Sequence, residues 1–233
     1  MRINKIKSGW KDCNKLLLCL FLIFVLSGCD RQDRPSKTNS KPAQPPKIYE
    51  GTIIALGDSL TAGLGVAEEE AYPALLEGKL QQSGHNWQVF NAGISGETSS
   101  GALARINWII AQQPDIVILE TGANDGMRGI PPRVIKKNIS QAVHLLKESD
   151  IEVVLAGMQM LQNLGPGYTK QFAGIYPAIA EEQQVIFIPF FLEQVAGNPS
   201  LNLPDAIHPT PAGHRIVMQT VYPFVVKAIQ QNR

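Results

Sequence analysis

"TIIALGDSLTAG", residues Thr52–Gly63, joins a run of apolar and β-branched residues to a polar turn that contains one serine, Ser59. Such a run is typical of a β-strand that is buried on both faces. Glycines lie at both ends of the turn, where a sharp change of chain direction favours them. The stretch therefore predicts a strand with a serine just beyond its carboxyl end.

Four similar runs recur along the chain. The five runs are "TIIAL" from Thr52, "WQVFN" from Trp87, "DIVIL" from Asp115, "IEVVLA" from Ile151 and "VIFIPF" from Val185. Their starts are 35, 28, 36 and 34 residues apart, which is the length of a strand, a crossover helix and two loops. Because the runs are almost continuously apolar, we expect an α/β fold in which helices cover both faces of a five-stranded parallel sheet.

Two of the intervening segments have clear helical patterns. Residues 131–149 begin with two prolines and place Ile135, Ile139, Ala142 and Leu146 on one apolar stripe. The last segment has Thr210 in a suitable N-cap position and Pro211 at the first helical position. Both segments are predicted to be amphipathic helices.

The polar clusters of the domain each follow a strand. Ser59 follows the first strand, Gly93 the second, Asn124 the third, and the pair Asp205 and His208 the fifth. The carboxyl ends of parallel strands lie along one edge of the sheet, where ligands bind in open α/β folds. Residues that are 150 positions apart in the sequence are therefore expected to meet in one cleft.

A serine hydroxyl becomes a nucleophile when a base takes its proton and a carboxylate orients that base. Of the four histidines, His85 is expected in a turn, His144 on a solvated helix face, and His214 in packing or capping. His208 differs because Asp205 precedes it by three residues, a spacing that lets the carboxylate reach the imidazole. That spacing alone is weak support, since histidines are common in loops.

Acyl transfer also needs hydrogen-bond donors for the oxyanion. "NAGISGETSSG" (Asn91–Gly101) and "ETGANDGMRG" (Glu120–Gly129) are glycine-rich turns at strand ends. The Gly93 N–H group and the Asn124 amide are the candidate donors that they supply. Taken alone, each loop is better explained by ordinary turn chemistry.

In combination these blocks resemble a known family. "GDSL" (Gly57–Leu60), Gly93 in "NAGISGETS", "GAND" (Gly122–Asp125) and "DAIH" (Asp205–His208) stand in the order of the four blocks of the GDSL (SGNH) hydrolases. The resemblance covers residues 51 to about 220 and is closest to the branch of bacterial arylesterases and multifunctional thioesterase/lysophospholipases. One departure is Ala206, where this branch commonly has glycine. Alanine is tolerated there unless the position needs a positive φ.

The resemblance implies a three-layer α/β/α sandwich of the flavodoxin-like kind and ester hydrolysis by a serine. It implies Ser59 as nucleophile, His208 as general base and then acid, and Asp205 as the group that orients it. The Ser59 N–H group would join Gly93 and Asn124 in the oxyanion hole. No cofactor is implied, no metal-ligand pattern is present, and Asp58 and Asp125 are expected to brace loops.

The N-terminal region predicts export. Residues 1–15 carry a net charge of +4 and precede the apolar run "LLLCLFLIFVL" (Leu16–Leu26), which is the size of a signal-peptide core and too short to span a bilayer. "LSGC" (Leu26–Cys29) resembles the bacterial lipoprotein signal, so residues 1–28 are expected to be removed and Cys29 to be lipidated. An uncleaved signal anchor and a plain secretory peptide are the alternatives. The inner or outer membrane and the oligomeric state stay open.

Residues 29–47 contain four prolines and almost no apolar side chains, so we expect a disordered tether between the lipidated cysteine and the hydrolase domain, residues 48–233. The whole chain has a net charge of +1 while residues 1–15 carry +4 and residues 29–47 carry +3, which leaves −6 on the domain. An acidic domain argues against nucleic-acid binding. All three cysteines precede the domain, so a thiol nucleophile and a cysteine zinc site are excluded there.

The predicted function is hydrolysis of aryl or short-to-medium acyl esters or lysophospholipids, with acyl thioesters as a further substrate. An exported enzyme would not meet cytosolic acyl-CoA. The loop after the fourth strand carries apolar residues that either line an acyl channel, form a lid or pack in the ordinary way: Met158, Met160, Leu161 and Leu164. The alternatives are a carbohydrate O-acetylesterase that acts on cell-wall sugars and a non-catalytic binding lipoprotein.

Overall fold

The computed structural model describes residues 48–160 and 164–232, which contain a parallel sheet of five strands in the order β2-β1-β3-β4-β5. The strands are β1 (Gly51–Gly57), β2 (Trp87–Gly93), β3 (Ile116–Leu119), β4 (Glu152–Ala156) and β5 (Ile186–Ile188). Each strand coincides with one of the five predicted runs: β3, β4 and β5 lie within theirs, whereas β1 and β2 extend one or two residues beyond. The order is that of flavodoxin-like folds.

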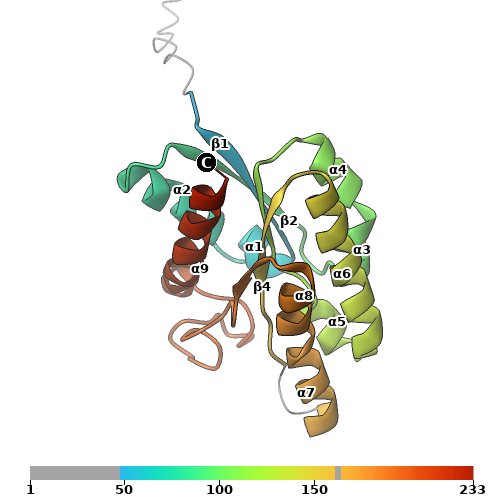
Figure 1. Ribbon diagram of the computed structural model, residues 1–233. Coiled ribbons are helices and arrows are strands. Elements are labelled where there is room, and N and C mark those ends of the chain that lie inside the picture. Colours follow the sequence, from blue (N-terminus) through green and yellow to red (C-terminus); the bar gives the residue numbers. More distant parts are fainter. Residues whose placement is uncertain (1–47, 161–163, 233) are drawn as a thin grey trace, which may run out of the picture. The chain divides into compact units, whose positions relative to one another are not determined.

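Helices form a layer on each face of the sheet (Figure 1). On one face, α2 (Tyr72–Gln82) packs against α9 (Pro211–Gln231). The other face carries α3 (Ser99–Ala104), α4 (Ile106–Ala111), α6 (Pro132–Glu148), α7 (Pro166–Ala173) and α8 (Ile175–Gln183). Three short elements stand near strand ends: α1 (Ser59–Ala62), the 3₁₀ helix η1 (Glu68–Glu70) and α5 (Ala123–Met127). The expected α/β/α sandwich is confirmed.

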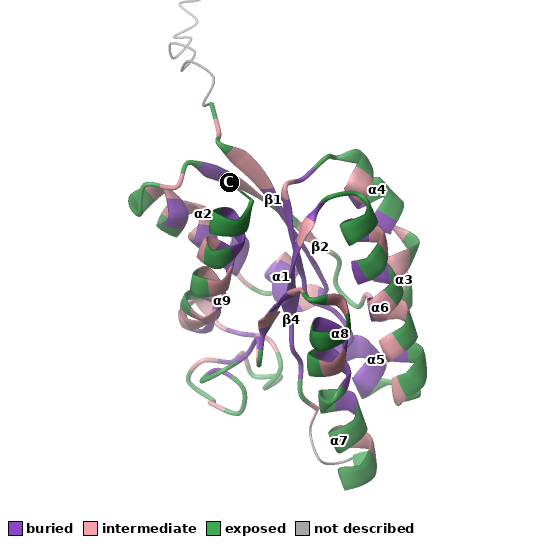
Figure 2. Ribbon diagram, viewed as in Figure 1, coloured by how far each residue is buried: buried purple, intermediate pink, exposed green. Residues whose placement is uncertain are grey.

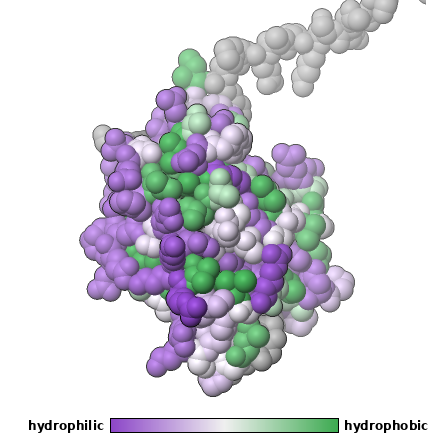
Figure 3. Space-filling view, turned by 90° about the vertical axis from the view of Figure 1, so that its right-hand side faces the viewer, coloured by the Kyte–Doolittle hydropathy of each residue, from purple (hydrophilic) through white to green (hydrophobic). Residues whose placement is uncertain are grey.

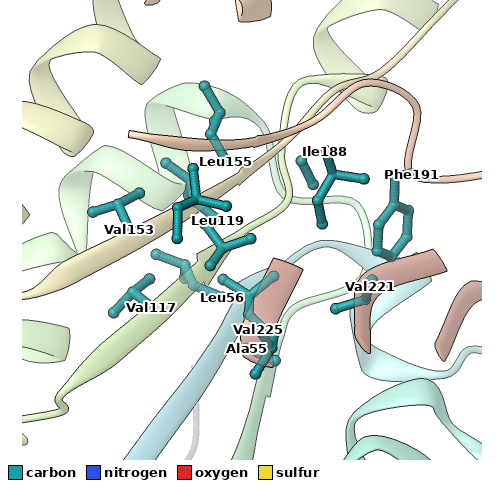
Figure 4. Close-up of a cluster of buried hydrophobic side chains, with 14 of the residues drawn as sticks. Ala55, Leu56, Val117, Leu119, Val153, Leu155, Ile188, Phe191, Val221 and Val225 are labelled. Carbon is teal, nitrogen blue, oxygen red and sulfur yellow. The ribbon is translucent and has the colours of Figure 1, made fainter. Parts of the chain in front are cut away.

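The core lies between the sheet and its two helical layers. All four residues of β3 are fully buried, and the helices turn buried residues inward and exposed residues outward (Figure 2). Strand residues pack against α9 side chains such as Val221 and Val225 (Figure 4). Burial on both faces explains the continuously apolar sequences of β1, β3 and β4, whereas β2 at the edge of the sheet is only partly buried.

The two predicted helices begin and pack as expected. In α6, Ile135, Ile139, Ala142 and Leu146 are all buried against the core. In α9, the Thr210 hydroxyl accepts a hydrogen bond of 3.2 Å from the Gly213 N–H group. This bond satisfies one of the donors that a helix start leaves free.

Two histidines have structural positions. His144 is 63% exposed and pairs with Glu148 on the solvated side of α6. His214 is fully buried, and its Nδ1 atom accepts a hydrogen bond of 3.3 Å from the Tyr72 N–H group, which joins α9 to the start of α2. Burial, with a smaller electrostatic contribution from the His208 ring, lowers the pKa of His214 to about 4. His214 is therefore neutral at neutral pH.

Apolar residues also reach the surface. The face that carries the α3, α4 and α6 layer shows hydrophobic patches among hydrophilic ones (Figure 3). Phe90 on β2, Ile94 just after it and Trp108 on α4 are each about half exposed. Across residues 48–160 and 164–232, no helix combines the length and the apolar character that crossing a bilayer requires.

Candidate active site

The parallel register brings three of the predicted blocks to one edge of the sheet. Gly57 at the end of β1 is paired with Gly93 at the end of β2, and Leu56 is paired with Leu119 at the end of β3. Ser59 follows Gly57 after one residue, and Asn124 lies in α5, which follows β3. The strand ends are level, so these groups are neighbours.

Ser59 is the first residue of α1, a single helical turn. The carboxylate of Asp58 caps this turn, because its Oδ1 atom accepts a hydrogen bond of 3.0 Å from the Leu60 N–H group. Gly63 ends the turn with a φ of 77°, which glycine adopts without a steric cost. The glycines and the aspartate of this block therefore shape the turn that carries the serine.

Ser59, His208 and Asp205 form a continuous hydrogen-bonded chain. The Ser59 Oγ atom lies 2.9 Å from Nε2 of His208. The Nδ1 atom of the same ring lies 2.8 Å from Oδ2 of Asp205. A contact across 149 positions thus joins the turn after β1 to the loop that precedes α9.

Asp205 lies at the surface, yet its environment favours the ionised form. Its Oδ1 atom accepts hydrogen bonds of 3.0 Å from the His208 N–H group and 2.9 Å from the Ile207 N–H group. These bonds and the His208 ring lower the pKa of Asp205 to about 2, with the His208 N–H group as the largest cause. The carboxylate therefore stays charged at neutral pH and fixes the orientation of the ring.

Ala206 has a φ of 59°, so it occupies the left-handed region. The condition under which alanine would be unfavourable at this position is therefore met. An L-residue there costs roughly 1–2 kcal/mol relative to ordinary backbone. The bonds from Asp205 to the two following N–H groups hold the turn in this conformation, as does a hydrogen bond of 2.8 Å from the Ala206 N–H group to the Leu203 carbonyl oxygen.

Gly93 packs directly against α1. A Cβ atom at this position would lie 2.1 Å from the backbone nitrogen of Ala62, so only glycine fits. The Gly93 N–H group donates a hydrogen bond of 2.9 Å to Oδ1 of Asn91. Asn91 is exposed at the end of β2.

Asn124 is buried and donates a hydrogen bond of 3.0 Å from Nδ2 to Oδ2 of Asp58. An amide group has two N–H donors, so this bond orients the side chain and leaves one donor for another acceptor. Asp125, next to it, accepts hydrogen bonds from the Ser99 N–H and hydroxyl groups at 2.7 and 2.6 Å. Asp58 and Asp125 thus brace the loops, as the sequence predicts.

Glu120 is a fully buried carboxyl group beneath the serine turn. Its Oε2 atom accepts hydrogen bonds from the Asp58 N–H group at 3.1 Å and the Thr61 hydroxyl at 2.9 Å, while Oε1 has no partner among the described residues. Burial, reinforced by the neighbouring charge of Asp58, holds the pKa of Glu120 well above its ordinary value. Burial likewise raises the pKa of Asp58.

The apolar loop after β4 is described in part. Met158 is buried in the core, which fits ordinary packing. Met160 lies against Gly126 of α5, where a Cβ atom would meet its sulfur at 2.2 Å, and Leu164 is partly exposed. Leu161 lies outside the described residues. Of the four, Met160 lies against the helix that carries Asn124.

A cavity of about 720 Å³ lies along β2 and ends at Asn91 and Gly93. Its walls include the exposed side chains of Phe90, Ile94 and Trp108. A cavity of this size can hold a small organic ligand. Apolar surface is thus available next to one of the candidate oxyanion donors.

The GDSL-like lipase/acylhydrolase family matches residues 55–216. The chain belongs to this family. The arylesterase of Vibrio mimicus is 40% identical over 176 residues, which make up 75% of this chain and 88% of that protein. The thioesterase 1/protease 1/lysophospholipase L1 of Escherichia coli strain K12 is 39% identical over 159 residues, which make up 68% of this chain and 75% of that protein.

Among solved structures, the psychrotrophic esterase EstA from Pseudoalteromonas sp., inhibited by monoethylphosphonate, is similar with a TM-score of 0.74 and 32% identity. The match covers 78% of this chain and all of that one. The family expected from the four blocks is confirmed. The GDSL family member described here is a carboxylic ester hydrolase.

Sequence reasoning did not single out Glu120, Arg105 or Glu97. Glu120 directly follows the apolar run "DIVIL", and this position at the end of a buried strand could have predicted a buried carboxyl group. Glu97 lies in the glycine-rich block with Gly93, and Arg105 follows that block by four residues. The two side chains form a partly buried ion pair at 2.7 Å, which nothing in their spacing indicates. Their contacts depend on how that loop folds back over the strand ends.

We predict that Glu120→Gln gains stability relative to the wild type as pH rises. The folded-state pKa of Glu120 is above its unfolded value, so the wild type binds an extra proton on folding and loses stability as pH climbs from about 4.5 towards the folded pKa. Glutamine keeps the acceptor oxygen and does not titrate.

Urea unfolding of both proteins at pH 5 and pH 8 measures this difference. The variant should be relatively more stable at pH 8 than at pH 5. An equal difference in the free energy of unfolding at the two pH values would contradict a protonated Glu120.

Proposed function

We propose that this chain hydrolyses aryl or short-to-medium acyl esters and lysophospholipids through a Ser59–His208–Asp205 triad and an acyl-enzyme, with acyl thioesters as a further substrate. The observation that carries the proposal is the hydrogen-bonded chain from the Ser59 hydroxyl through the His208 ring to Asp205. Its geometry matches what a serine nucleophile needs, because the base contacts the hydroxyl and a carboxylate holds the base.

In the first half of the reaction, Nε2 of His208 takes the proton from Ser59 Oγ as this oxygen attacks the ester carbonyl carbon. Asp205 stays ionised and stabilises the protonated ring. His208 then gives its proton to the leaving alcohol or thiol, and the acyl group remains on Ser59. A water molecule then attacks the acyl carbonyl carbon while His208 takes its proton. His208 gives this proton to Ser59 Oγ as the acyl–oxygen bond breaks, which releases the carboxylic acid and restores the serine.

The tetrahedral intermediates carry a negative oxygen that needs donors. Three groups at the sheet edge are suited to it: the Ser59 N–H group, the Gly93 N–H group and the Asn124 side chain. The first residue of a helix has no acceptor for its N–H group within the helix, so Ser59 can direct this donor outward. The Gly93 N–H group would donate to the oxyanion in place of Asn91 Oδ1. Asn124 would donate through the amide N–H that is not bonded to Asp58.

The choice of an apolar ester is supported by two observations. The relatives named above are an arylesterase and a thioesterase/lysophospholipase. The cavity that ends at Gly93 is walled by Phe90, Ile94 and Trp108, which suit an aryl group or an acyl chain, although neither Ser59 nor His208 lines it. Met160 beside α5 is a second candidate surface for the chain.

Alanine substitutions test the triad. We expect Ser59→Ala and His208→Ala to lower kcat by about 10⁴-fold or more, and Asn124→Ala by about 10²–10³-fold because one oxyanion donor is lost. His144→Ala removes an exposed histidine remote from the triad and serves as the matched control.

Steady-state hydrolysis of p-nitrophenyl esters of increasing acyl length, a lysophospholipid and an acetylated sugar measures activity and substrate class together. Full activity in Ser59→Ala would refute the mechanism. A preference for the acetylated sugar would replace the proposed substrate class.

We also propose that residues 1–28 are a signal peptide, that Cys29 is lipidated and that residues 30–47 tether the hydrolase domain to a membrane. The support is the "LSGC" motif, the basic region before the apolar run and the proline-rich segment that follows. Residues 1–47, Cys29 among them, lie outside the described residues.

Expression of the full chain in bacteria with a clickable fatty acid tests the anchor. We expect label on the wild type and none on Cys29→Ser, with the wild type in the membrane fraction. Cys19→Ser is the matched control, because Cys19 lies within the segment expected to be removed. Equal labelling of Cys29→Ser would contradict the proposal.

A further inference from the structure

Apolar side chains are exposed at the edge of the sheet that carries Ser59 and His208. Of the nine large apolar side chains that are exposed among the described residues, six lie in the segments that follow the strands at this edge. Every strand is followed by at least one of the six, which are between 38% and 50% exposed: Leu64, Ile94, Met127, Val134, Leu164 and Ile207. We call these six residues the apolar rim. Single exposed apolar side chains are ordinary, but a group of them at one edge marks an interaction surface.

Backbone hydrogen bonds tie the rim to the residues of the site. The Leu64 N–H group donates a hydrogen bond of 3.1 Å to the carbonyl oxygen of Ser59. The Ile207 N–H group donates a hydrogen bond of 2.9 Å to Oδ1 of Asp205, and Ile207 directly precedes His208. The rim therefore borders the hydrogen-bonded chain of serine, histidine and aspartate and is fixed relative to it.

The charges beside the rim are mixed in sign. Arg128 and Arg133 are exposed, and each directly adjoins a rim residue in the sequence. The helix η1 (Glu68–Glu70) places glutamates shortly after Leu64. Arginine side chains can lay their apolar stems on hydrocarbon while the charged ends stay among phosphates. Because both signs are present, we expect the contact to depend on the apolar side chains rather than on a charged partner.

The proposed tether is long enough to let this edge face a membrane. β1 begins at Gly51, at the end of the sheet opposite to α1 and α5 (Figure 1). A strand rises about 3.3 Å per residue, so the length of β1 separates the start of the domain from the catalytic edge by roughly 23 Å. Residues 30–47 amount to 18 residues, and a proline-rich chain of this length can extend to about 55 Å. The domain can therefore turn its catalytic edge to the bilayer that would hold Cys29.

We propose that the apolar rim docks the catalytic edge on the surface of the bilayer that anchors the chain, so that Ser59 meets substrates that reside in the membrane. The substrate class that this arrangement favours is the lysophospholipid, whose acyl chain lies in the bilayer and whose ester bond lies at its surface. Binding of this kind scales with the apolar area that enters the boundary of the hydrocarbon. The inference rests on the proposed function and the proposed anchor, and it adds the lipid surface as a partner.

A fluorescent label on the rim tests contact with lipid directly. Residues 48–233 contain no cysteine, so one introduced cysteine can be labelled in the full chain after its processing and lipidation. The labelled protein is placed in phosphatidylcholine vesicles that contain a nitroxide lipid. We expect the label on Val134→Cys to be quenched and the label on His144→Cys to stay bright. Both positions lie on α6, where ten residues separate them by about 15 Å, and His144 is 63% exposed.

Hydrolysis of two esters by the anchored protein separates docking from catalysis. A triple variant with Leu64→Gln, Met127→Gln and Val134→Gln removes three rim side chains and leaves the triad unchanged. We expect its rate on lysophosphatidylcholine in vesicles to fall about tenfold or more, because these side chains no longer gain from transfer to hydrocarbon. Its kcat/KM for dissolved p-nitrophenyl butyrate should stay within about twofold of the wild type.

Ile48→Gln is the matched control. Ile48 is 85% exposed and precedes β1, at the end of the sheet opposite to the rim. Both of its rates should equal those of the wild type. Thermal unfolding of all variants is recorded alongside, because substitutions of exposed side chains usually change stability little. If the triple variant fails to fold, Met127→Gln alone and the two labelled proteins decide the matter.

The inference is overturned if the label at position 134 is quenched no more than the label at position 144. It is also overturned if the triple variant keeps the wild-type rate on the lysophospholipid, or if it loses equal activity on both esters, which would make the rim part of the substrate site. Shielding of the Val134→Cys label without vesicles, together with a dimer in sedimentation, would assign the rim to a second copy of the chain. Activity of Ser59→Ala would instead refute the proposed function, and a wild type without fatty-acid label would refute the anchor.

Discussion

The parallel pairing of β1 with β2 on one side and β3 on the other is the constraint on which the site depends. Because Gly57 is level with Gly93, and Leu56 with Leu119, the turn after β1, the end of β2 and the start of α5 all emerge at one edge of the sheet. The loop before α9 then brings His208 to the same edge. A shift of one residue in either pairing would move Ser59 away from the candidate donors, so the apolar strands that fix the register also fix the geometry of the chemistry.

A layer of buried polar groups supports this edge from beneath. Asp58 caps α1 and holds Asn124, Glu120 accepts from the backbone of Asp58, and Arg105 bonds the carbonyls at the ends of β1 and β2. Most of these contacts are made to backbone groups or to other buried side chains. Such bonds tolerate little movement, which suits a site whose donors must be in place before charge develops.

The strands and the two helices were predictable because they depend on local signals. Ser59, His208 and Asp205 were assigned from the order of the four sequence blocks, because the spacing of Asp205 and His208 alone was weak support. The strand runs have a regular spacing, Thr210 and Pro211 mark a helix start, and Asp205 reaches His208 across three residues. The contact of Glu120 with Asp58 and that of Arg105 with Gly57 join segments distant in sequence, which composition and periodicity do not encode. The sequence indicated only that alanine would be unfavourable at position 206 if this position needed a positive φ. The positive φ itself is a property of the folded turn. The hydrogen bond from the Gly93 N–H group to Asn91 was equally unpredictable, since any exposed polar side chain nearby could have served.

The most direct test of the account is a crystal structure of the enzyme after reaction with a monoalkyl phosphonate, the class of inhibitor bound in the related EstA. The phosphonate mimics the tetrahedral intermediate. We expect phosphorus on Ser59 Oγ, with one phosphonyl oxygen within hydrogen-bond distance of the Gly93 N–H group and the Asn124 amide, and the Asn91 side chain displaced from Gly93. An adduct on any other residue, or a phosphonyl oxygen turned away while Asn91 still holds the Gly93 N–H group, would contradict it.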